Sequence, residues 1–264
     1  MTMLISYMAK AALSAAAVGA LLTMLRHAAP RASGLAAAVP ISSMPALFWL
    51  SMEHGGGYAA TVALGSFWGT GLTALLGVAF ARLTSICHAA VAASLACAAV
   101  GILAALIWTL PAALTAMTAF ALIVVLTGRT AQSHSRSASQ RRAGGLIESV
   151  LSMGFAGVMS LLVAEVAKHG APQVGGLVAT IPVVGTCALY SGHRRGGAPV
   201  MLRVLDGYLT GMLAKAAFLG ALCAAWSAGV GSWAWAIALA VASVALLAQR
   251  NLRSVRNFSL RSEP

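Results

Sequence analysis

Long apolar runs constrain the fold of this chain more than any other feature of its sequence. Each run is close to the length of about twenty residues that a helix needs to cross a hydrocarbon core. We place about nine runs, at residues 3–25, 33–51, 57–82, 86–109, 111–128, 145–167, 174–191, 199–226 and 230–249. With 60% apolar and 8% charged residues, the composition also lies outside the range of soluble domains. We therefore expect an all-α, polytopic transmembrane helix bundle of about nine spans.

A motif in the second run recurs in the seventh. The stretch from His27 to Leu47 aligns without a gap with the stretch from His169 to Leu189, at an offset of 142 residues (169 minus 27). The positions that keep their residue type are His27/His169, Ala29/Ala171, Pro30/Pro172, Gly34/Gly176, Leu35/Leu177, Ala37/Ala179, Pro40/Pro182, Ala46/Ala188 and Leu47/Leu189. The same offset relates Gly55, Gly65 and Gly69 to Gly197, Gly207 and Gly211. These matches predict an internal duplication.

The arginines indicate how the spans are oriented. With nine spans, every arginine falls in the gaps of one side, close to the ends of the runs that border them, or in the C-terminal tail, whereas the other side holds Glu53, His54, Lys168 and His169. The excess of basic residues on cytoplasmic loops then places the C-terminus in the cytoplasm and the N-terminus outside. The two copies would enter the membrane in opposite senses, as two repeats of inverted topology. We expect a multi-pass membrane protein in this orientation.

The same features divide the chain into four parts. Residues 1–128 form a first membrane repeat with a connector span, and residues 129–144, rich in Ser, Arg and Gln, form a cytoplasmic linker. Residues 145–250 form the second membrane repeat, and residues 251–264 form a basic cytoplasmic tail. The net charge of +12 belongs to this orientation pattern, and we expect no nucleic-acid partner.

Prolines interrupt one apolar run of each copy. Pro40 and Pro45 are predicted to interrupt the run at 33–51, and Pro182 with Gly185 the run at 174–191. A proline frees a carbonyl of the preceding turn, which in lipid must find a partner or a water-filled cavity. The alternative is a simple packing kink, which stays open here. The predicted substrate-binding residues are Pro40, Ser42, Ser43, Pro45, Thr180, Pro182 and Thr186.

Several titratable residues lie within or beside the apolar runs. Charged groups inside a membrane are costly and often mark pathways. The predicted proton- or charge-coupling residues are Lys10, Glu165, Asp206, Lys215, His27 and His169. Asp206 and Lys215 lie on opposite faces of one helix, since nine residues turn it by about 900°. The alternatives are that Lys10 and Glu165 extend to the interface and that the two histidines cap helix ends.

The remaining signals concern packing and chemistry. Glycines at i, i+4 spacing, Gly65 with Gly69 and Gly207 with Gly211, predict close helix packing. The four cysteines lie in apolar runs, without the spacing of a metal site. The motifs of common hydrolases, nucleotide-binding proteins and zinc proteases are missing from the sequence. We predict no enzyme activity, no cofactor and no metal.

One stretch resembles a known family. Residues 167–250 resemble the small GlpM-type membrane proteins of bacteria, on Lys168, Gly176-Leu177-Val178, Pro182, Ala188-Leu189 and the Gly-containing loop after Tyr190. Since such proteins are usually one copy long, the chain looks like a fused pair. The resemblance implies a multi-span inner-membrane protein and no particular mechanism.

These observations lead to two hypotheses of function. The first is a secondary transporter or exporter of a small solute, with protons as the candidate coupling ion, because inverted repeats with interrupted helices are typical of such carriers. The second is a non-transporting membrane scaffold or accessory subunit. The lipid bilayer is a partner under both hypotheses, and a homo-oligomer is compatible with both.

Overall fold

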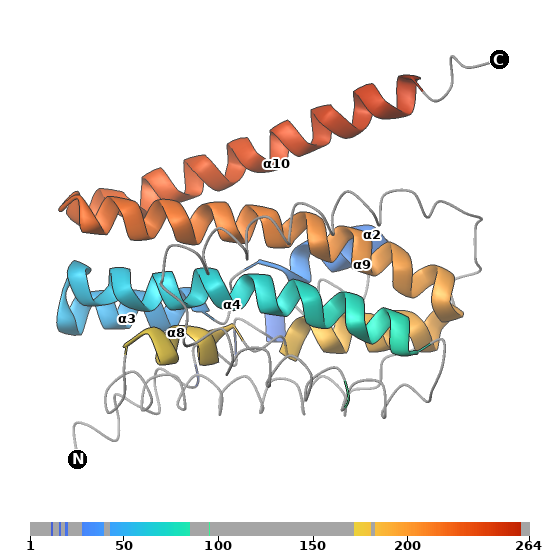
Figure 1. Ribbon diagram of the computed structural model, residues 1–264, viewed down its shortest axis with the longest axis horizontal. Helices are drawn as coiled ribbons and strands as arrows, with labels where there is room; N and C mark the ends of the chain where they lie inside the picture. Colours follow the sequence, from blue (N-terminus) through green and yellow to red (C-terminus); the bar gives the residue numbers. More distant parts are fainter. Residues whose placement is uncertain are drawn as a thin grey trace.

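The structure is a helical bundle (Figure 1). The computed structural model describes residues 28–39, 43–84, 172–180 and 183–259, with isolated positions at Ala12, Ala16, Gly19, Ala20 and Leu95. Within these residues all regular elements are helices and no strand occurs, which confirms the predicted all-α class for this part of the chain. Three segments are long and apolar enough to cross a membrane: Gly56–Leu83, Gly196–Ser227 and Gly231–Asn251. Apart from those isolated positions, the runs predicted at 3–25, 86–109, 111–128 and 145–167 lie outside the described residues.

The first copy forms a short helix, a break, a second helix and a long helix. Helix α2 (Pro30–Ala37) starts with a proline, whose fixed φ suits the first turn. After the break, α3 (Ser43–His54) leads to Gly55, and α4 (Gly56–Leu83) follows. Gly55 has a φ of 82°, a conformation that glycine adopts without strain, so the chain can reverse between α3 and α4.

The second copy repeats this order. Helix α8 (Pro172–Ala179) has both bounds 142 residues after those of α2. Helix α9 (Val183–Ser227) is divided by a kink at Gly196 and Gly197, and Gly197 has a φ of 68°. Gly197 is the counterpart of Gly55, so both copies turn at the same glycine. We call 183–195 the first segment of α9 and Gly196–Ser227 its second segment.

The helix breaks lie close to the predicted positions, with one correction. The prediction that Pro45 and Gly185 interrupt their helices is wrong, because each is the third residue of the helix that follows the break, α3 and α9 respectively. A first-turn proline is tolerated, because its missing N–H would have no partner inside the helix. The breaks precede these residues. Pro40 and Pro182 lie outside the described residues.

The long helices of the two copies form the centre of the bundle. Helix α4 and the second segment of α9 lie side by side and run in opposite directions (Figure 1). Two apolar clusters hold them together at different heights. One contains Phe80, Leu205 and Leu209, and the other contains Leu50, Leu222 and Trp226.

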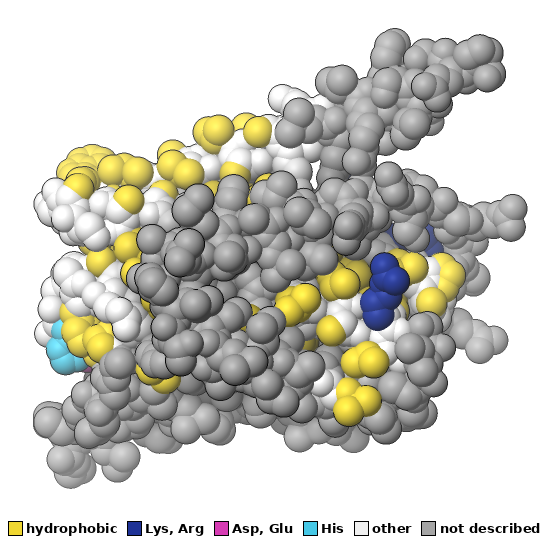
Figure 2. Space-filling view, viewed as in Figure 1, with side chains coloured by type: hydrophobic (Ala, Val, Ile, Leu, Met, Phe, Trp, Pro, Cys, Tyr) yellow, Lys and Arg dark blue, Asp and Glu magenta, His cyan; other side chains and the backbone are white. Residues whose placement is uncertain are grey.

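The last helix differs from the others in its burial. After the short 3-10 turn η1 (Gly231–Trp233), α10 (Ala234–Ser259) packs against α9 near its start and then diverges from the bundle (Figure 1). Only 11% of its most apolar window is buried, against 61% for the other two candidate spans. Leu239, Val244 and Leu247 are exposed. Hydrophobic side chains therefore cover much of its surface in Figure 2.

The two ends of the bundle differ in composition. Trp226 and Trp235 stack edge to face with ring centroids 5.4 Å apart, and Phe48 contacts both Trp49 and Trp235. Trp49, Trp226, Trp233 and Trp235 lie near this end. The Lys and Arg side chains visible in Figure 2 lie toward the other end, where α4 finishes.

Candidate functional site

Each short helix packs against the long helix of the other copy. Gly34 of α2 lies against the backbone of Val204 and Tyr208 in α9, so closely that a Cβ atom there would overlap it. Gly176 of α8 lies in the same way against the backbone of Val62 and Ser66 in α4. The partners of these two glycines are again 142 residues apart. The same contact therefore occurs twice, once in each copy.

The glycine pairs of the long helices complete these contacts. Gly65 and Gly69 of α4 face Gln173 and Thr180 of α8. Gly207 and Gly211 of α9 face α2, with Gly207 against the Arg31 carbonyl and Gly211 against Ala38 and the Leu35 carbonyl. The predicted close packing of these four glycines is confirmed, and their partners are the short helices. As a result, the C-terminal ends of both short helices lie against the two central helices, Ala38 at Gly211 and Thr180 at Gly69.

Buried polar side chains gather at mid-height of the bundle, between the two apolar clusters. On α4, Ser66, Thr70 and Thr73 lie between Ala63, which belongs to one cluster, and Ala74, which belongs to the other. On α9, Lys215 lies between Met212 and Phe218, which belong to different clusters. We call this set the central polar layer, and it consists of Ser43, Ser66, Thr70, Thr73, Thr180 and Lys215, each with at most 6% of its surface exposed.

Two hydroxyl groups of the layer bind carbonyls at the end of α8. The Thr180 N–H donates to the Leu177 carbonyl at 3.1 Å, which leaves the Gly176 carbonyl without its usual partner four residues later. Ser66 Oγ donates to that carbonyl at 3.0 Å. Thr73 Oγ1 shares its proton between the Thr180 carbonyl, at 2.9 Å, and the Gly69 carbonyl of its own helix, at 2.7 Å. Two carbonyls at the end of α8 thus accept hydrogen bonds from side chains of the other copy.

The corresponding positions on α9 carry different side chains. The 142-residue offset places Tyr208 and Lys215 on α9 where α4 has Ser66 and Thr73. Tyr208 is 1% exposed, and its ring and hydroxyl lie against Gly185 of the same copy, where a side chain would collide with them. The two long helices therefore present different chemistry at equivalent positions: two hydroxyl groups on α4, and a phenol and an amine on α9.

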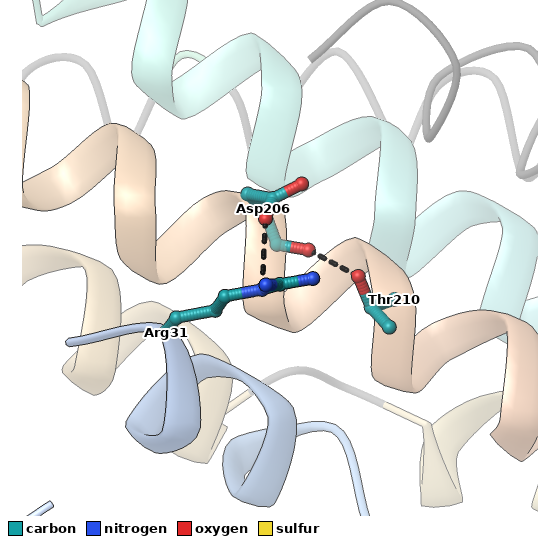
Figure 3. Close-up of polar contacts among 3 residues, drawn as sticks. All are labelled: Arg31, Asp206 and Thr210. Carbon is teal, nitrogen blue, oxygen red and sulfur yellow. Dashed lines mark hydrogen bonds and ion pairs between the residues drawn. The ribbon is translucent and has the colours of Figure 1, made fainter. Parts of the chain in front are cut away.

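An ion pair joins the copies nearer the kink of α9. Arg31 Nε lies 3.2 Å from Asp206 Oδ2, with the arginine side chain 57% exposed and the aspartate side chain 14% exposed (Figure 3). Thr210 Oγ1 donates to the backbone carbonyl of Asp206 at 2.7 Å. The corresponding positions of the other contact are Gln173 and Leu64, which carry no charge. The ion pair therefore distinguishes one half of the bundle from the other.

The structure brings together some of the predicted site residues. Ser43, Thr180 and Lys215 belong to the central polar layer, while Pro45 and Thr186 are partly buried in the first turns of α3 and α9. Asp206 instead pairs with Arg31. The others lie outside the described residues: Lys10, His27, Pro40, Ser42, Glu165, His169 and Pro182. In the part of the chain that is described, no three His, Cys, Asp or Glu side chains gather as a metal site requires.

The sequence analysis missed four members of this region. Ser66, Thr70 and Thr73 lie on one face of α4, and Tyr208 is the counterpart of Ser66. The available signal was the spacing of three hydroxyl residues at i, i+4 and i+7 in an otherwise apolar helix. That spacing places the three residues on one side, but it does not name the helix that they face.

Comparisons with known proteins add no assignment. No protein-family model, no characterised protein and no solved structure matches the chain. The resemblance to GlpM-type proteins therefore stays an expectation from the sequence.

Proposed function

We propose that the chain is a secondary transporter or exporter of a small solute in the bacterial inner membrane, and that the central polar layer is its solute site. The observation that carries the proposal is the reciprocal packing of α2 on α9 and of α8 on α4. It brings two discontinuous helices to one buried polar layer between two copies. Secondary transporters commonly bind their substrates in such a place.

Opposed insertion of the two copies is part of the proposal. Helix α4 and its counterpart, the second segment of α9, run antiparallel, as equivalent helices of an inverted repeat do (Figure 1). We count α2 with α3 as one discontinuous span, and α8 with the first segment of α9 as another. With the spans outside the described residues, this gives about nine crossings, an external N-terminus and a cytoplasmic C-terminus.

The Arg31–Asp206 ion pair supports a transport pathway that differs between the two halves of the bundle. Asp206 is largely buried and pairs with Arg31, while the equivalent site in the other half has no charge. Buried carboxylates in membrane proteins often serve proton relays. We assign proton coupling to Asp206 and Glu165, and the ion pair must open when Asp206 takes up a proton.

Access of water to the layer tests the site. In a cysteine-free background, Thr70→Cys is expected to react with a small water-soluble thiol reagent from at least one side of the membrane. Ala63→Cys is the matched control, because both positions are 0% exposed on α4 but Ala63 belongs to an apolar cluster. If neither cysteine reacts, the layer is dry and the transporter proposal fails.

Solute uptake into proteoliposomes tests the coupling. Uptake of a labelled solute is expected to respond to a pH gradient in the wild type. Asp206→Asn and Glu165→Gln are expected to abolish this response while solute exchange at equal pH continues. A gradient response that is unchanged in both variants would remove proton coupling from the proposal.

A non-transporting scaffold or accessory subunit is the second candidate. The observation in its favour is α10, whose exposed apolar side chains offer a surface to a partner helix as well as to lipid. In that case the polar layer only satisfies the helix breaks. The labelling of Thr70→Cys distinguishes the two functions.

A further inference from the structure

A surface rich in arginine lies at the end of the bundle where α4 finishes and α9 turns. Two contacts show that these parts of the chain lie at one height. Thr84 Oγ1, just after α4, donates to Met201 Sδ at 3.6 Å, and Gly192 of the first segment of α9 lies against the backbone of Met201. Helix α2 joins them through its ion pair with α9 (Figure 3). We call this surface the basic end, and it consists of Arg31, Arg82, Arg194 and Arg203.

The positive charge of the basic end is only partly balanced. Two acids occur among the described residues, and of these Asp206 lies at this end, where it pairs with Arg31 at 3.2 Å. The other, Glu53, lies in the last turn of α3, beside the turn that leads into α4 at the opposite end of the bundle. The described part of the basic end therefore carries four arginines and one aspartate. An anion from outside the chain would reduce their mutual repulsion.

The duplication provides an internal comparison for these arginines. The residues equivalent to Arg31, Arg82, Arg194 and Arg203 at the 142-residue offset are Gln173, Ala224, Met52 and Thr61. None of these four is charged, although α8 packs on α4 through the same glycine contacts by which α2 packs on α9. Packing of the two copies thus does not require the arginines. They suit a partner that surrounds the basic end alone.

Arg203 is the member of the basic end best placed to hold an anion. It is partly buried on the second segment of α9, and within the described residues its Nε is buried and has no hydrogen-bond partner. Its counterpart Thr61 is satisfied inside its own helix, where Thr61 Oγ1 donates to the Gly57 carbonyl at 3.2 Å. A guanidinium that has lost part of its hydration gains more from an anion than a fully hydrated one, because water screens the two charges less. Its planar set of donors matches the oxygens of a phosphate in particular.

The position of the basic end on the candidate spans indicates a lipid. Arg82 lies in the last turn of α4, and Arg203 lies within about two turns of the start of the candidate span Gly196–Ser227. Helices that cross a bilayer end in the headgroup region, where the phosphates of phospholipids lie. Helix α10 runs back toward this end (Figure 1), with Leu239 and Val244 exposed along its course. A phospholipid would thus find a basic surface at the height of its headgroup and an apolar surface for its chains.

We propose that the basic end binds the phosphate of an anionic phospholipid headgroup, with Arg203 as the principal contact. The inference does not depend on transport, and it holds equally for a scaffold. The competing role of the arginines is to orient the spans during insertion, which requires positive charge but no particular residue. A binding site differs from orientation because one arginine then matters more than another.

Thermal unfolding of the purified full-length chain in a neutral detergent tests the site. Phosphatidylglycerol, which is anionic, is compared with phosphatidylcholine, which carries the same phosphate but no net charge, and with inorganic phosphate at matched ionic strength. We expect a saturable rise of the melting temperature with phosphatidylglycerol and a much smaller rise with the other two. Equal rises with both lipids, or no rise with phosphatidylglycerol, would reject the inference. An equal rise with inorganic phosphate would replace the lipid by a soluble anion and reject it as well.

Two arginine variants separate a site from total charge. Arg203→Gln is expected to weaken the apparent affinity for phosphatidylglycerol roughly tenfold, whereas Arg203→Lys retains part of it. Arg250→Gln is the matched control, since it removes the same charge from an exposed position of α10 outside the basic end. Equal affinities in Arg203→Gln and Arg250→Gln would overturn the inference, because total charge alone would then govern lipid binding.

A measurement on the wild type covers the case in which Arg203→Gln does not fold. Phosphatidylglycerol is expected to slow the modification of Arg203 by a dicarbonyl reagent, as quantified by mass spectrometry, more than phosphatidylcholine does. Equal modification rates with the two lipids would reject the site. Because these measurements use no solute, their failure leaves the transport proposal to the thiol labelling of the central polar layer and to the uptake experiment.

Discussion

At the scale of single residues, glycines decide how closely the two copies approach. Gly65 and Gly207 each lie against a backbone carbonyl of the opposite short helix. Because backbone atoms cannot rotate away as a side chain can, an added methyl group must push the whole helix outward. Small residues of this kind permit the close helix contacts on which membrane proteins depend, since apolar burial alone does not drive association in lipid.

The first prediction compares two glycines of one helix. Gly207→Ala is expected to destabilise the protein by about 1–3 kcal/mol, since its Cβ atom would overlap the Arg31 carbonyl. Gly220→Ala should be neutral or stabilising by about 0.5–1 kcal/mol, because its Cβ atom would meet only the Phe67 ring, at 3.5 Å. Unfolding of both variants in detergent measures the difference. Equal stabilities would show that α2 does not pack on α9 as described.

At the scale of elements, the end of α8 depends on hydroxyl groups that another helix provides. A broken helix leaves carbonyls without partners, and in lipid these are not satisfied by water. Ser66 and Thr73 of α4 satisfy two of them. The end of α8 and α4 therefore stabilise each other, and the local sequence of neither names the other as its partner.

The second prediction separates two threonines of α4. Thr73→Val is expected to cost about 1–3 kcal/mol, because it removes the hydroxyl that the buried Thr180 carbonyl of another helix shares with the Gly69 carbonyl of α4. Thr70→Val should cost less, since Thr70 Oγ1 binds the Ser66 carbonyl within its own helix, at 2.8 Å. Equilibrium unfolding of the two variants provides the comparison. An equal cost in both would contradict a capping role for Thr73.

The third prediction concerns α10. Leu239 and Val244 are 50% and 64% exposed on the surface of the bundle. Apolar side chains at such positions of a membrane span are expected to face lipid. In a cysteine-free background in native membranes, cysteines at these two positions are expected to resist a membrane-impermeant maleimide until detergent and denaturant are added. A cysteine at Val230, in the turn before α10, should react without denaturation. Rapid labelling of the two helix positions would place α10 outside the membrane.

At the scale of the whole molecule, the bundle combines two copies of one order of elements. The equivalent long helices run antiparallel, and each short helix lies on the other copy's long helix. A two-fold relation of this kind lets one set of contacts be used twice. The two copies differ at particular equivalent positions. Lys215 corresponds to Thr73, and the Arg31–Asp206 ion pair corresponds to the uncharged residues Gln173 and Leu64.

The fourth prediction is about topology. The turn at Gly55 and the turn at Gly197 join equivalent helices, so opposed insertion should place them on opposite sides of the membrane. Single cysteines at these turns are expected to react with an impermeant reagent from opposite sides of oriented vesicles. Positions 27 and 169 should likewise map to opposite sides. Labelling of both turns from one side would exclude inverted topology.

The sequence by itself determined which described segments are helical and where they turn. Uncharged apolar runs in α4 and α9 must satisfy their backbone groups internally, and the glycines at 55 and 197 permit the reversals that follow. These are local properties, so they are visible one segment at a time. The 142-residue offset also predicted that the turn and the packing glycines of the first copy occur again in the second.

Only the tertiary structure decided which helix each copy contacts. The spacing of Gly65 and Gly69 indicated close packing, but α8 as the partner depends on contacts more than a hundred residues apart in the chain. For the same reason, the sequence placed Arg31 in a loop and Asp206 in a helix without pairing them. In the sequence, Lys215 was a candidate site residue only because it lies deep within an apolar run. The packing of α2 on α9, with Gly207 and Gly211 against its backbone, was equally invisible in the sequence, because tertiary packing fixes which side chains meet.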